Sequence, residues 1–597
     1  MQPNPYKQPV RRQWKVTSTQ RIKLWYVFIV LVAALFIGRL FYLQIVRHDF
    51  YRAAALADQL KEYSIPAQRG IIEVQDGNTT VPLVLNQTLY TLFADPAFST
   101  VNAASEAQQV AAVVGGKASN YQSLMSVSGA RYEVLAKRLS EAQNNKILAL
   151  KLPGVGTQAQ DYRVYPQGDL ASQMLGFVDD SGQGRYGIEQ TLNAQLAGTP
   201  GTLKAITDAS GVPLAASPDN VKVDPKPGSN VVLTIDLAMQ RGLESILRQG
   251  LQAVASKSGS AVIIDPTTGA IKAMANYPSY DPSKFYNVSD LSLFSNSAVS
   301  STLEVGSIMK SLTVSAALDR RVITPDTAYH DPGYVTIDGS TIKNVLPITT
   351  PTITIKDVLQ HSLNTGAVHM LKELGGGSLD KAGRDVWHDY MVNHFQLGKP
   401  TGIEQTGEAS GSIPDPDHGY ALDLQYAETA FGQGMSATIL QMGAAFASAV
   451  NGGTYYKPHL VEAVVAPSGA TNQTQPQIVK QNVISSQASA QVRELMQYVF
   501  TQNHTIYASN LHTGYNIGGK TGTAQIAKSG GGYLDGIYNG TFLGYVGGNM
   551  PQYVIAIRVD KPNLPAYDAA GSQAAAPIFG KIADMLINNF NVKPKSH

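Results

Sequence analysis

The sequence contains no cysteine, which excludes disulfide bonds, thiolate nucleophiles and thiolate metal sites together. Charge is scarce as well: only 15% of the residues are charged and the formal net charge is +2, so a nucleic-acid-binding surface is not expected. The 11 histidines form no H-E-x-x-H string, and His361 and His369 have no evident third ligand. We therefore expect no metal, no cofactor and no redox chemistry.

One apolar run dominates the N-terminal part, at residues 24–46, and it is long enough to cross a bilayer. Residues 1–23 carry six basic side chains and no acidic one, so the positive-inside tendency predicts a cytoplasmic tail there. A cleaved signal peptide is the alternative, but no A-x-A-like site follows and the apolar run resumes after Arg39. We predict a single-pass helix in the cytoplasmic membrane, with the rest of the chain outside the cell.

With 597 residues, the chain is expected to form two or more folded domains. Residues 217–228, SPDNVKVDPKPG, have the composition of a linker. Before the linker, short alternating runs and turn signals predict a β-rich, non-catalytic pedestal module over residues 47–224, resembling a dimerisation domain, with a helical insert near residues 122–150. The catalytic domain is predicted over residues 225–597.

The catalytic domain begins with a strand pattern at residues 231–235, and Asp236 can cap the helix that follows. Helical patterns fill much of the middle of this domain. The remaining predicted strands are residues 261–265, 270–275, 541–546 and 553–559. These elements predict an α+β fold, an antiparallel sheet flanked by helices and joined to a helical subdomain.

The candidate nucleophile is Ser307 of the string Ser307-Ile308-Met309-Lys310. On a helix, a hydroxyl and an amine three residues apart share one face. The lysine can activate the serine only if its pKa falls toward neutrality, through burial or a nearby cation. Ile308 and Met309 indicate an apolar site, and Lys520 could supply the cation. On its own this string is weak, because a surface serine and lysine on one helix fit it equally well.

Two further strings follow in the required order, Ser362-Leu363-Asn364 and then Lys520-Thr521-Gly522-Thr523. S-x-x-K, S-D-N and K-T-G together are the signature of β-lactamases and penicillin-binding proteins, and Leu363 replaces the aspartate of that version. The chain resembles the class B penicillin-binding proteins, the monofunctional transpeptidases that cross-link peptidoglycan.

Other stretches are similar to that family from the anchor nearly to the C-terminus. There are two departures: the lead-in Y-x-P-G-S is Leu303 to Ser307 here, and D-R-N-G has become Val74 to Gly77, which affects local loops. The similar stretches are Gln68 to Ile72, Arg163 to Pro166, Gly187 to Glu189, Leu233 to Asp236, Asn296, Gly432 to Gly434 with Thr438 and Gln441, and Asn451 to Gly453.

The resemblance implies a role for each residue of the three strings. Ser307 would attack the penultimate D-alanine of a stem peptide, and Lys310 would accept its proton. Ser362 would relay protons to the leaving group, and Asn364 would orient Lys310 and the donor amide. Lys520, Thr521, Gly522 and Thr523 would hold the terminal carboxylate, and the backbone N–H groups of Ser307 and Thr523 would form the oxyanion hole.

The resemblance also implies partners. β-Lactams are expected to acylate the serine, and a multi-pass membrane glycosyltransferase is expected to bind the anchor and pedestal. We expect a septal rather than an elongation role. A D,D-carboxypeptidase or β-lactamase, with water as acceptor, and a penicillin-binding sensor remain as alternatives. A bifunctional glycosyltransferase is disfavoured, because residues 47–224 show no paired-carboxylate polymerase motif.

The same lysine also completes a P-loop string, Gly514 to Thr521, which fits G-x-x-x-x-G-K-[ST]. A phosphate-binding loop needs a helix immediately after it, so that free N–H groups meet the phosphate. Residues 522–527 instead predict a strand, followed by the glycine-rich residues 529–532. An NTPase is therefore disfavoured.

Overall fold

The computed structural model describes residues 18–52, 60–99, 102–206, 221–346, 348, 351–528, 531–564 and 569–596. Most of the predicted cytoplasmic tail and residues 217–220 of the predicted linker lie outside this part of the chain. The chain divides into two compact units, Met1–Ala67 with Thr199–Lys226, and Gln68–Gly198 with Pro227–His597. Each is described by itself.

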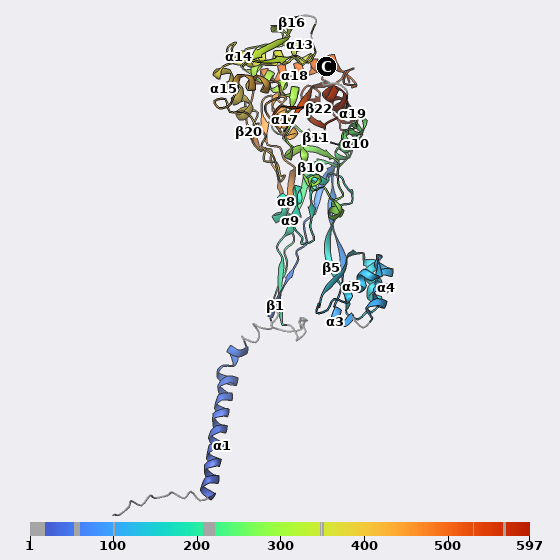
Figure 1. The fold of residues 1–597 in the computed structure, drawn as a ribbon, viewed down its shortest axis with the longest axis vertical. Helices are drawn as coiled ribbons and strands as arrows, with labels where there is room; N and C mark the ends of the chain where they lie inside the picture. The colour runs from blue at the N-terminus through green and yellow to red at the C-terminus, as the bar shows by residue number, and fades with distance from the viewer. Residues whose placement is uncertain are drawn as a thin grey trace, which may run out of the picture. The chain divides into compact units, whose positions relative to one another are not determined.

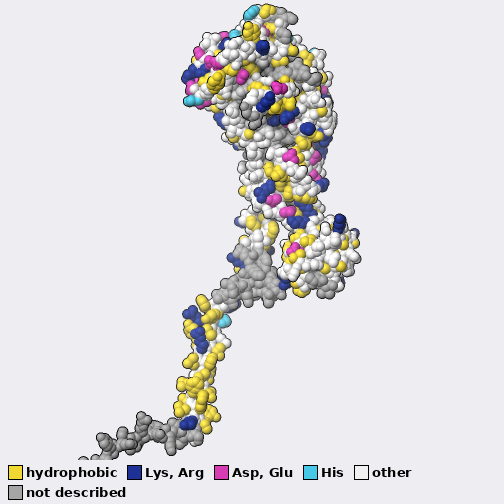
Figure 2. All heavy atoms as spheres, viewed as in Figure 1, with side chains coloured by type: hydrophobic (Ala, Val, Ile, Leu, Met, Phe, Trp, Pro, Cys, Tyr) yellow, Lys and Arg dark blue, Asp and Glu magenta, His cyan; other side chains and the backbone are white. Residues whose placement is uncertain are grey.

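The first unit contains the predicted membrane helix. Helix α1 (Ser18–Phe41) continues into the π-helical turn η1 (Tyr42–Val46). Residues 21–46 are long and apolar enough to cross a bilayer, and none of this span is buried. Figure 2 shows the hydrophobic side chains along the helix. These properties fit a single-pass anchor. The unit also holds the antiparallel sheet β1 (Leu60–Ile65), β8 (Gly201–Ile206) and β9 (Val221–Val223), so part of the predicted linker is a strand.

The second unit begins with a β-rich region, as predicted. Its seven-stranded sheet has the order β19-β18-β10-β2-β3-β4, and β5 pairs with β3. Strands β10 and β18, from the C-terminal part of the chain, belong to this sheet. The bounds are β2 (Ile72–Asp76), β3 (Thr79–Ala94), β4 (Glu133–Leu139), β5 (Val155–Val164), β10 (Asn230–Asp236), β18 (Val461–Val465) and β19 (Thr471–Gln473).

The predicted helical insert near residues 122–150 is only partly helical. Strand β4 lies between α5 (Ala118–Met125) and α6 (Glu141–Ala149), and α4 (Ala103–Val114) precedes them. Leu135 and Leu139 of β4 are buried in the core beside α4 and α6. Pairing with β3 therefore prevails over the helical pattern of this segment.

A buried ion cluster lies where two family-like stretches meet. Glu189 is fully buried and accepts from Arg69 at 2.5 Å and from Arg163 at 2.8 Å. Arg69 also donates to Asn193 at 2.8 Å. Because a buried carboxylate is costly without partners, the two guanidinium groups account for its burial. The cluster joins the start of the β-rich sheet to α8 (Gly187–Thr191).

The catalytic part is built on a five-stranded antiparallel sheet of order β12-β11-β23-β22-β21. This confirms all four strands predicted for the sheet. Figure 1 labels two of these strands, β11 and β22. Strand β21 is an edge strand, so one side of its backbone is free to meet a ligand. The bounds are β11 (Ser258–Ile264), β12 (Ile271–Tyr277), β21 (Asn516–Ala527), β22 (Tyr533–Gly547) and β23 (Pro551–Asp560).

Helices cover both faces of this sheet. On one face lie α10 (Leu237–Ala253) and α19 (Ala576–Asn589), which share a core with Ile263 and Ile557. Asp236 caps α10, as predicted, by accepting from the backbone N–H of Met239 at 2.9 Å. On the other face, α17 (Ile439–Val450) packs on β11 and β23, and every one of its residues is buried.

The helical subdomain follows the nucleophile string in the sequence, and the predicted α+β architecture is confirmed. Its chain enters through the 3-10 turn η4 (Gly306–Met309) and α12 (Lys310–Asp319). A two-stranded hairpin, β14 (Tyr334–Ile337) and β15 (Ser340–Lys343), comes before the main helices. These helices are α13 (Ile355–Gln360), α14 (Asn364–Leu374), α15 (Lys381–Asp389), α16 (Leu422–Thr429) and α18 (Ser486–Asn503).

Candidate active site

The nucleophile string lies at the start of a buried helix. Ser307 is in η4 and is half-buried, and Lys310 begins α12 and is fully buried. The two residues are therefore one helical turn apart, as the spacing predicts. Ile308 and Met309 are also fully buried, which confirms the predicted apolar surroundings.

The amine of Lys310 is held by the Ser362-Leu363-Asn364 string. Its Nζ donates to the backbone oxygen of Ser362 at 2.6 Å and to Oδ1 of Asn364 at 2.8 Å, and lies 3.3 Å from Oγ of Ser362. Burial, and then the charge of Lys520, hold the pKa of Lys310 well below its usual value. A neutral amine has two hydrogens and one lone pair. In the neutral form, the two short bonds would use both hydrogens and would leave the lone pair available to accept a proton.

Lys520 brings a second amine to the same serine. It lies on β21 with 1% of its surface exposed, and its Nζ donates to Oγ of Ser362 at 3.0 Å and to the backbone oxygen of Thr521 at 3.1 Å. Burial lowers the pKa of Lys520 to about 7. The Ser362 hydroxyl thus lies between two amines. Ser362 also adopts a left-handed φ of 55°, an uncommon conformation for a serine that is held in place by these contacts.

Strand β21 lies against η4 in an unusually close contact. A Cβ atom added to Gly306 would lie 2.4 Å from the backbone oxygen of Thr523, and one added to Gly522 would lie 2.9 Å from that of Val305. Both glycines are therefore required by space, and Gly306 also by its φ of +63°. This contact brings the backbone of Thr523 beside the turn that carries Ser307.

The two threonines of the third string have different partners. The hydroxyl of Thr523 accepts from the backbone N–H of Gly571 at 3.2 Å, which leaves its own hydrogen free to donate. The Thr521 side chain shares a hydrogen bond with Tyr507, which is buried in the core. Lys520 and Thr521 lie within β21. This strand is followed by a hairpin to β22 and not by the helix that a P-loop requires. The P-loop interpretation is therefore excluded.

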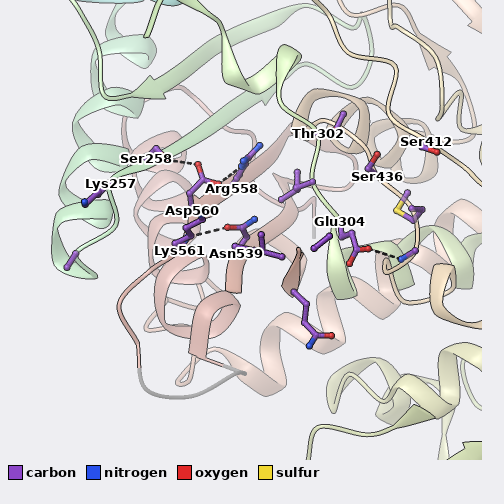
Figure 3. A pocket seen from close by; sticks show the side chains of 17 residues that line it. Lys257, Ser258, Thr302, Glu304, Ser412, Ser436, Asn539, Arg558, Asp560 and Lys561 are labelled. Carbon is purple, nitrogen blue, oxygen red and sulfur yellow. Dashed lines mark hydrogen bonds and ion pairs between the residues drawn. The ribbon is translucent and has the colours of Figure 1, made fainter. Parts of the chain in front are cut away.

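A cavity of about 1070 Å³ has Glu304 and Asn539 among its lining residues (Figure 3). Its walls are the adjacent ends of the sheet strands and the segments around Glu304 and Ser436. Lys257, Arg558 and Lys561 lie on one side of it and Glu304 on the other. Gln525 also lines the cavity and lies on β21 just after the third string. No residue of the three strings lines this cavity; Glu304, three residues before Ser307, and Gln525, two residues after Thr523, are the lining residues nearest to the strings in the sequence.

Glu304, three residues before Ser307, was missed by the sequence reasoning as a site residue. Its Oε1 accepts from the backbone N–H of Gly434 at 3.1 Å and from the Tyr533 hydroxyl at 3.2 Å. Its Oε2 is buried and has no hydrogen-bond partner among the described residues. Burial raises the pKa of Glu304. The sequence could have indicated Glu304 through its position in the segment Leu303 to Ser307, which directly precedes the nucleophile.

Two family models match the chain. "Penicillin binding protein transpeptidase domain" matches residues 259–584, more than half of the chain, and "Penicillin-binding Protein dimerisation domain" matches residues 64–233. The chain therefore belongs to the class B penicillin-binding proteins, and the resemblance found in the sequence is confirmed.

Individual relatives cover nearly the whole chain. Penicillin-binding protein PbpB of Mycobacterium tuberculosis is 32% identical over 94% of this chain and 84% of its own. Stage V sporulation protein D of Bacillus subtilis is 30% identical over 98% and 88%. The crystal structure of penicillin-binding protein 3 from M. tuberculosis complexed with aztreonam is 27% identical with a TM-score of 0.66, and the match covers 89% of this chain and 98% of that one.

Proposed function

We propose that this class B penicillin-binding protein is a peptidoglycan D,D-transpeptidase that works through an acyl-enzyme on Ser307. The observation that carries this proposal is the buried Lys310 amine, which donates to the backbone oxygen of Ser362 and to Asn364 and whose pKa is held well below its usual value. Lowering the pKa of a lysine is what allows it to act as a general base. The names of the relatives, among them peptidoglycan D,D-transpeptidases, support the same substrate.

In the acylation step, Oγ of Ser307 bonds to the penultimate D-alanine carbonyl carbon while Lys310 takes the hydroxyl proton. The oxyanion accepts from the backbone N–H groups of Ser307 and Thr523, a contribution typically worth about 10²–10³ in rate per donor. When the peptide bond breaks, Ser362 relays a proton from the Lys310 ammonium to the leaving nitrogen, and free D-alanine departs. Ser307 is then an ester, and Lys310 is neutral again.

Lys520 is suited to the terminal carboxylate. With a pKa of about 7, it is partly protonated at neutral pH, and a bound carboxylate favours the charged form. Thr523 has a free hydroxyl hydrogen for the same carboxylate, and Thr521 and Gly522 complete that segment of the edge strand. The upstream residues of the donor peptide extend along β21 toward Gln525 and the cavity, where Lys257, Lys561 and Glu304 offer charges of both signs.

An amine of a neighbouring stem peptide completes the reaction by attacking the ester, which restores the Ser307 hydroxyl. Water in place of this amine would make the protein a carboxypeptidase. Reaction with lipid-linked strands, with cross-links and released D-alanine measured together, separates the two. D-alanine release without cross-links would contradict transpeptidation.

The nucleophile is tested by labelling with a fluorescent penicillin, followed by intact mass and peptide mapping. We expect one adduct on Ser307 and none in Ser307→Ala. Ser311→Ala is the matched control, because Ser311 lies four residues further on, in α12, and donates to the backbone oxygen of Ile308. Labelling that survives in Ser307→Ala would contradict the assignment.

We also propose the cellular setting. The basic residues before α1 favour a cytoplasmic N-terminus, with the pedestal (residues 47–224) and the transpeptidase domain (residues 225–597) outside the cytoplasmic membrane. We propose a septal role with a multi-pass membrane glycosyltransferase partner, which the family resemblance supports. Deleting residues 47–224 should abolish stimulation of that partner, and retained stimulation would exclude the pedestal as the contact.

A further inference from the structure

The side-chain amide of Asn364 is fixed at both ends. Its oxygen accepts from Lys310 at 2.8 Å, and its nitrogen donates to the backbone oxygen of Lys343 at 3.0 Å. Lys343 is the last residue of β15, in the hairpin that comes before the main helices of the helical subdomain. Since the Lys343 oxygen can only accept, it determines which end of the amide faces Lys310.

The orientation of this amide matters for the base. With the oxygen toward Lys310, the amine donates to it and keeps its lone pair for a proton. With the amide reversed, its N–H₂ group would face the amine and would donate to that lone pair. The Lys310 ammonium would also lose an acceptor. The Lys343 carbonyl therefore protects the basicity of Lys310.

A buried carboxylate holds the base of this hairpin against α14. Asp331 is 7% exposed and accepts from the Thr365 hydroxyl at 2.7 Å and from the side-chain nitrogen of Asn344 at 2.8 Å. Asn344 in turn accepts from the backbone N–H of Thr365 at 3.1 Å. Asn344 and Thr365 are the direct neighbours of Lys343 and Asn364, so these bonds fix the distance between the two.

We propose that Asp331 and Asn344 are positioning residues, which hold the Lys343 carbonyl on Asn364 and thereby keep the lone pair of Lys310 directed away from Asn364. This inference rests on the proposed function, because its readout is acylation of Ser307. Neither residue touches the reacting atoms. Both lie outside the three strings that define the site in the sequence.

The test is a pair exchange. Asp331→Asn places an amide opposite the Asn344 amide, and Asn344→Asp places two carboxylates face to face. In the double variant, the new amide at position 331 would accept from the Thr365 hydroxyl and donate to the new carboxylate at position 344. That carboxylate would accept from the Thr365 N–H, so each bond is re-formed with the roles exchanged.

The full-length protein in detergent is used, and the acylation rate constant with a fluorescent penicillin is measured per active molecule between pH 5 and 9.

We expect each single variant to acylate about 10–100-fold more slowly. This is less than the full contribution of a general base, which is about 10²–10⁴-fold in rate, because Lys310 itself is still present. The acid limb of the pH profile should move to lower pH, because the Lys310 ammonium loses an acceptor while its charged neighbour Lys520 stays. The double variant should recover both the rate and the profile. Asp338→Asn is the matched control at the exposed tip of the same hairpin, where the carboxylate accepts only from Leu424 N–H among the described residues, and should behave as wild type.

The inference would be overturned if both single variants kept the wild-type acylation rate and pH profile. It would also be overturned if the single variants acylated slowly with an unchanged acid limb and the double variant did not recover the rate. If a single variant does not fold, Thr365→Val is measured in its place by the same criteria. This substitution removes the bonds from the Thr365 hydroxyl to Asp331 and Asn344 and keeps the bond from the Thr365 backbone N–H to Asn344. Failure of the proposed function would look different, since wild-type Ser307 would then carry no label.

Discussion

Two lysine amines around one serine hydroxyl define the chemistry at the scale of single residues. Lys310→Met keeps the length and apolar stem of the side chain but removes the lone pair. We expect acylation by a fluorescent penicillin to fall about 10²–10⁴-fold, the usual contribution of a general base. The second-order rate constant at pH 7.5 measures the loss.

Lys381→Met is the control for that substitution, because Lys381 ends a second string of the same type, Ser378-Leu379-Asp380-Lys381. Its side chain is 60% exposed and pairs with Asp417 and Asp385, which raise its pKa. A wild-type rate is expected there. A Lys310→Met enzyme that acylates within a few-fold of wild type would exclude Lys310 as the base.

The two strings also show what four residues of sequence can and cannot predict. Both have a serine and a lysine three residues apart, but Lys310 is fully buried whereas Lys381 is 60% exposed, and Ser378 lies before α15 rather than in a helical turn. The distant strings Ser362-Leu363-Asn364 and Lys520-Thr521-Gly522-Thr523 favour Ser307, because they supply the groups that surround Lys310. The roles of Asp331 and Asn344 could not be predicted, since their bonds depend on how a hairpin folds back onto α14.

At the scale of elements, the close contact of β21 with η4 sets the spacing of the two backbone N–H groups proposed for the oxyanion hole, those of Ser307 and Thr523. Gly306→Ala would place a Cβ atom 2.4 Å from the Thr523 oxygen and so must push the strand away from the turn. Separating the two backbone donors should slow acylation about 10²–10³-fold, as for loss of one oxyanion donor. Stopped-flow labelling measures this.

Gly306→Ala has two effects, backbone strain at a positive φ and the close approach to Thr523. Gly469→Ala is the control that produces the backbone strain alone. Gly469 has a φ of +84° but open space around the position of a Cβ atom. We expect this variant to acylate at the wild-type rate, with only a modest loss of thermal stability. Equal slowing in both variants would mean that the β21–η4 contact is not responsible.

Elements with a clear local signal were predicted well, and those defined by distant partners were not. The start of α10 after β10 was predictable from the capping residue Asp236, and β11 and β12 were predictable from the turn that joins them. By contrast, β4 lies in a stretch with a helical pattern and becomes a strand through pairing with β3. Helix α17 is buried on all sides, so no polar face marks its period.

At the scale of the whole molecule, the site is a cost to stability. Burying Lys310 and Lys520 favours their neutral forms in the folded protein, whereas the unfolded chain protonates both at neutral pH. Stability therefore rises with pH between the folded and the unfolded pKa, because the unfolded state binds more protons there. For Lys520 this window runs from about 7 to its usual value of 10.5.

This linkage predicts the behaviour of Lys520→Met. The variant replaces a buried ionisable amine with an apolar side chain of similar length, so its melting temperature should exceed that of wild type at pH 7. The difference should narrow as the pH rises and should level off above 10.5, where the unfolded chain has also released this proton and the wild-type lysine no longer loses one on folding. Thermal unfolding of the full-length proteins in detergent, followed by fluorescence at several pH values, measures both effects. A difference that stays constant with pH would show that the stabilisation comes from packing and not from the burial of a titrating amine.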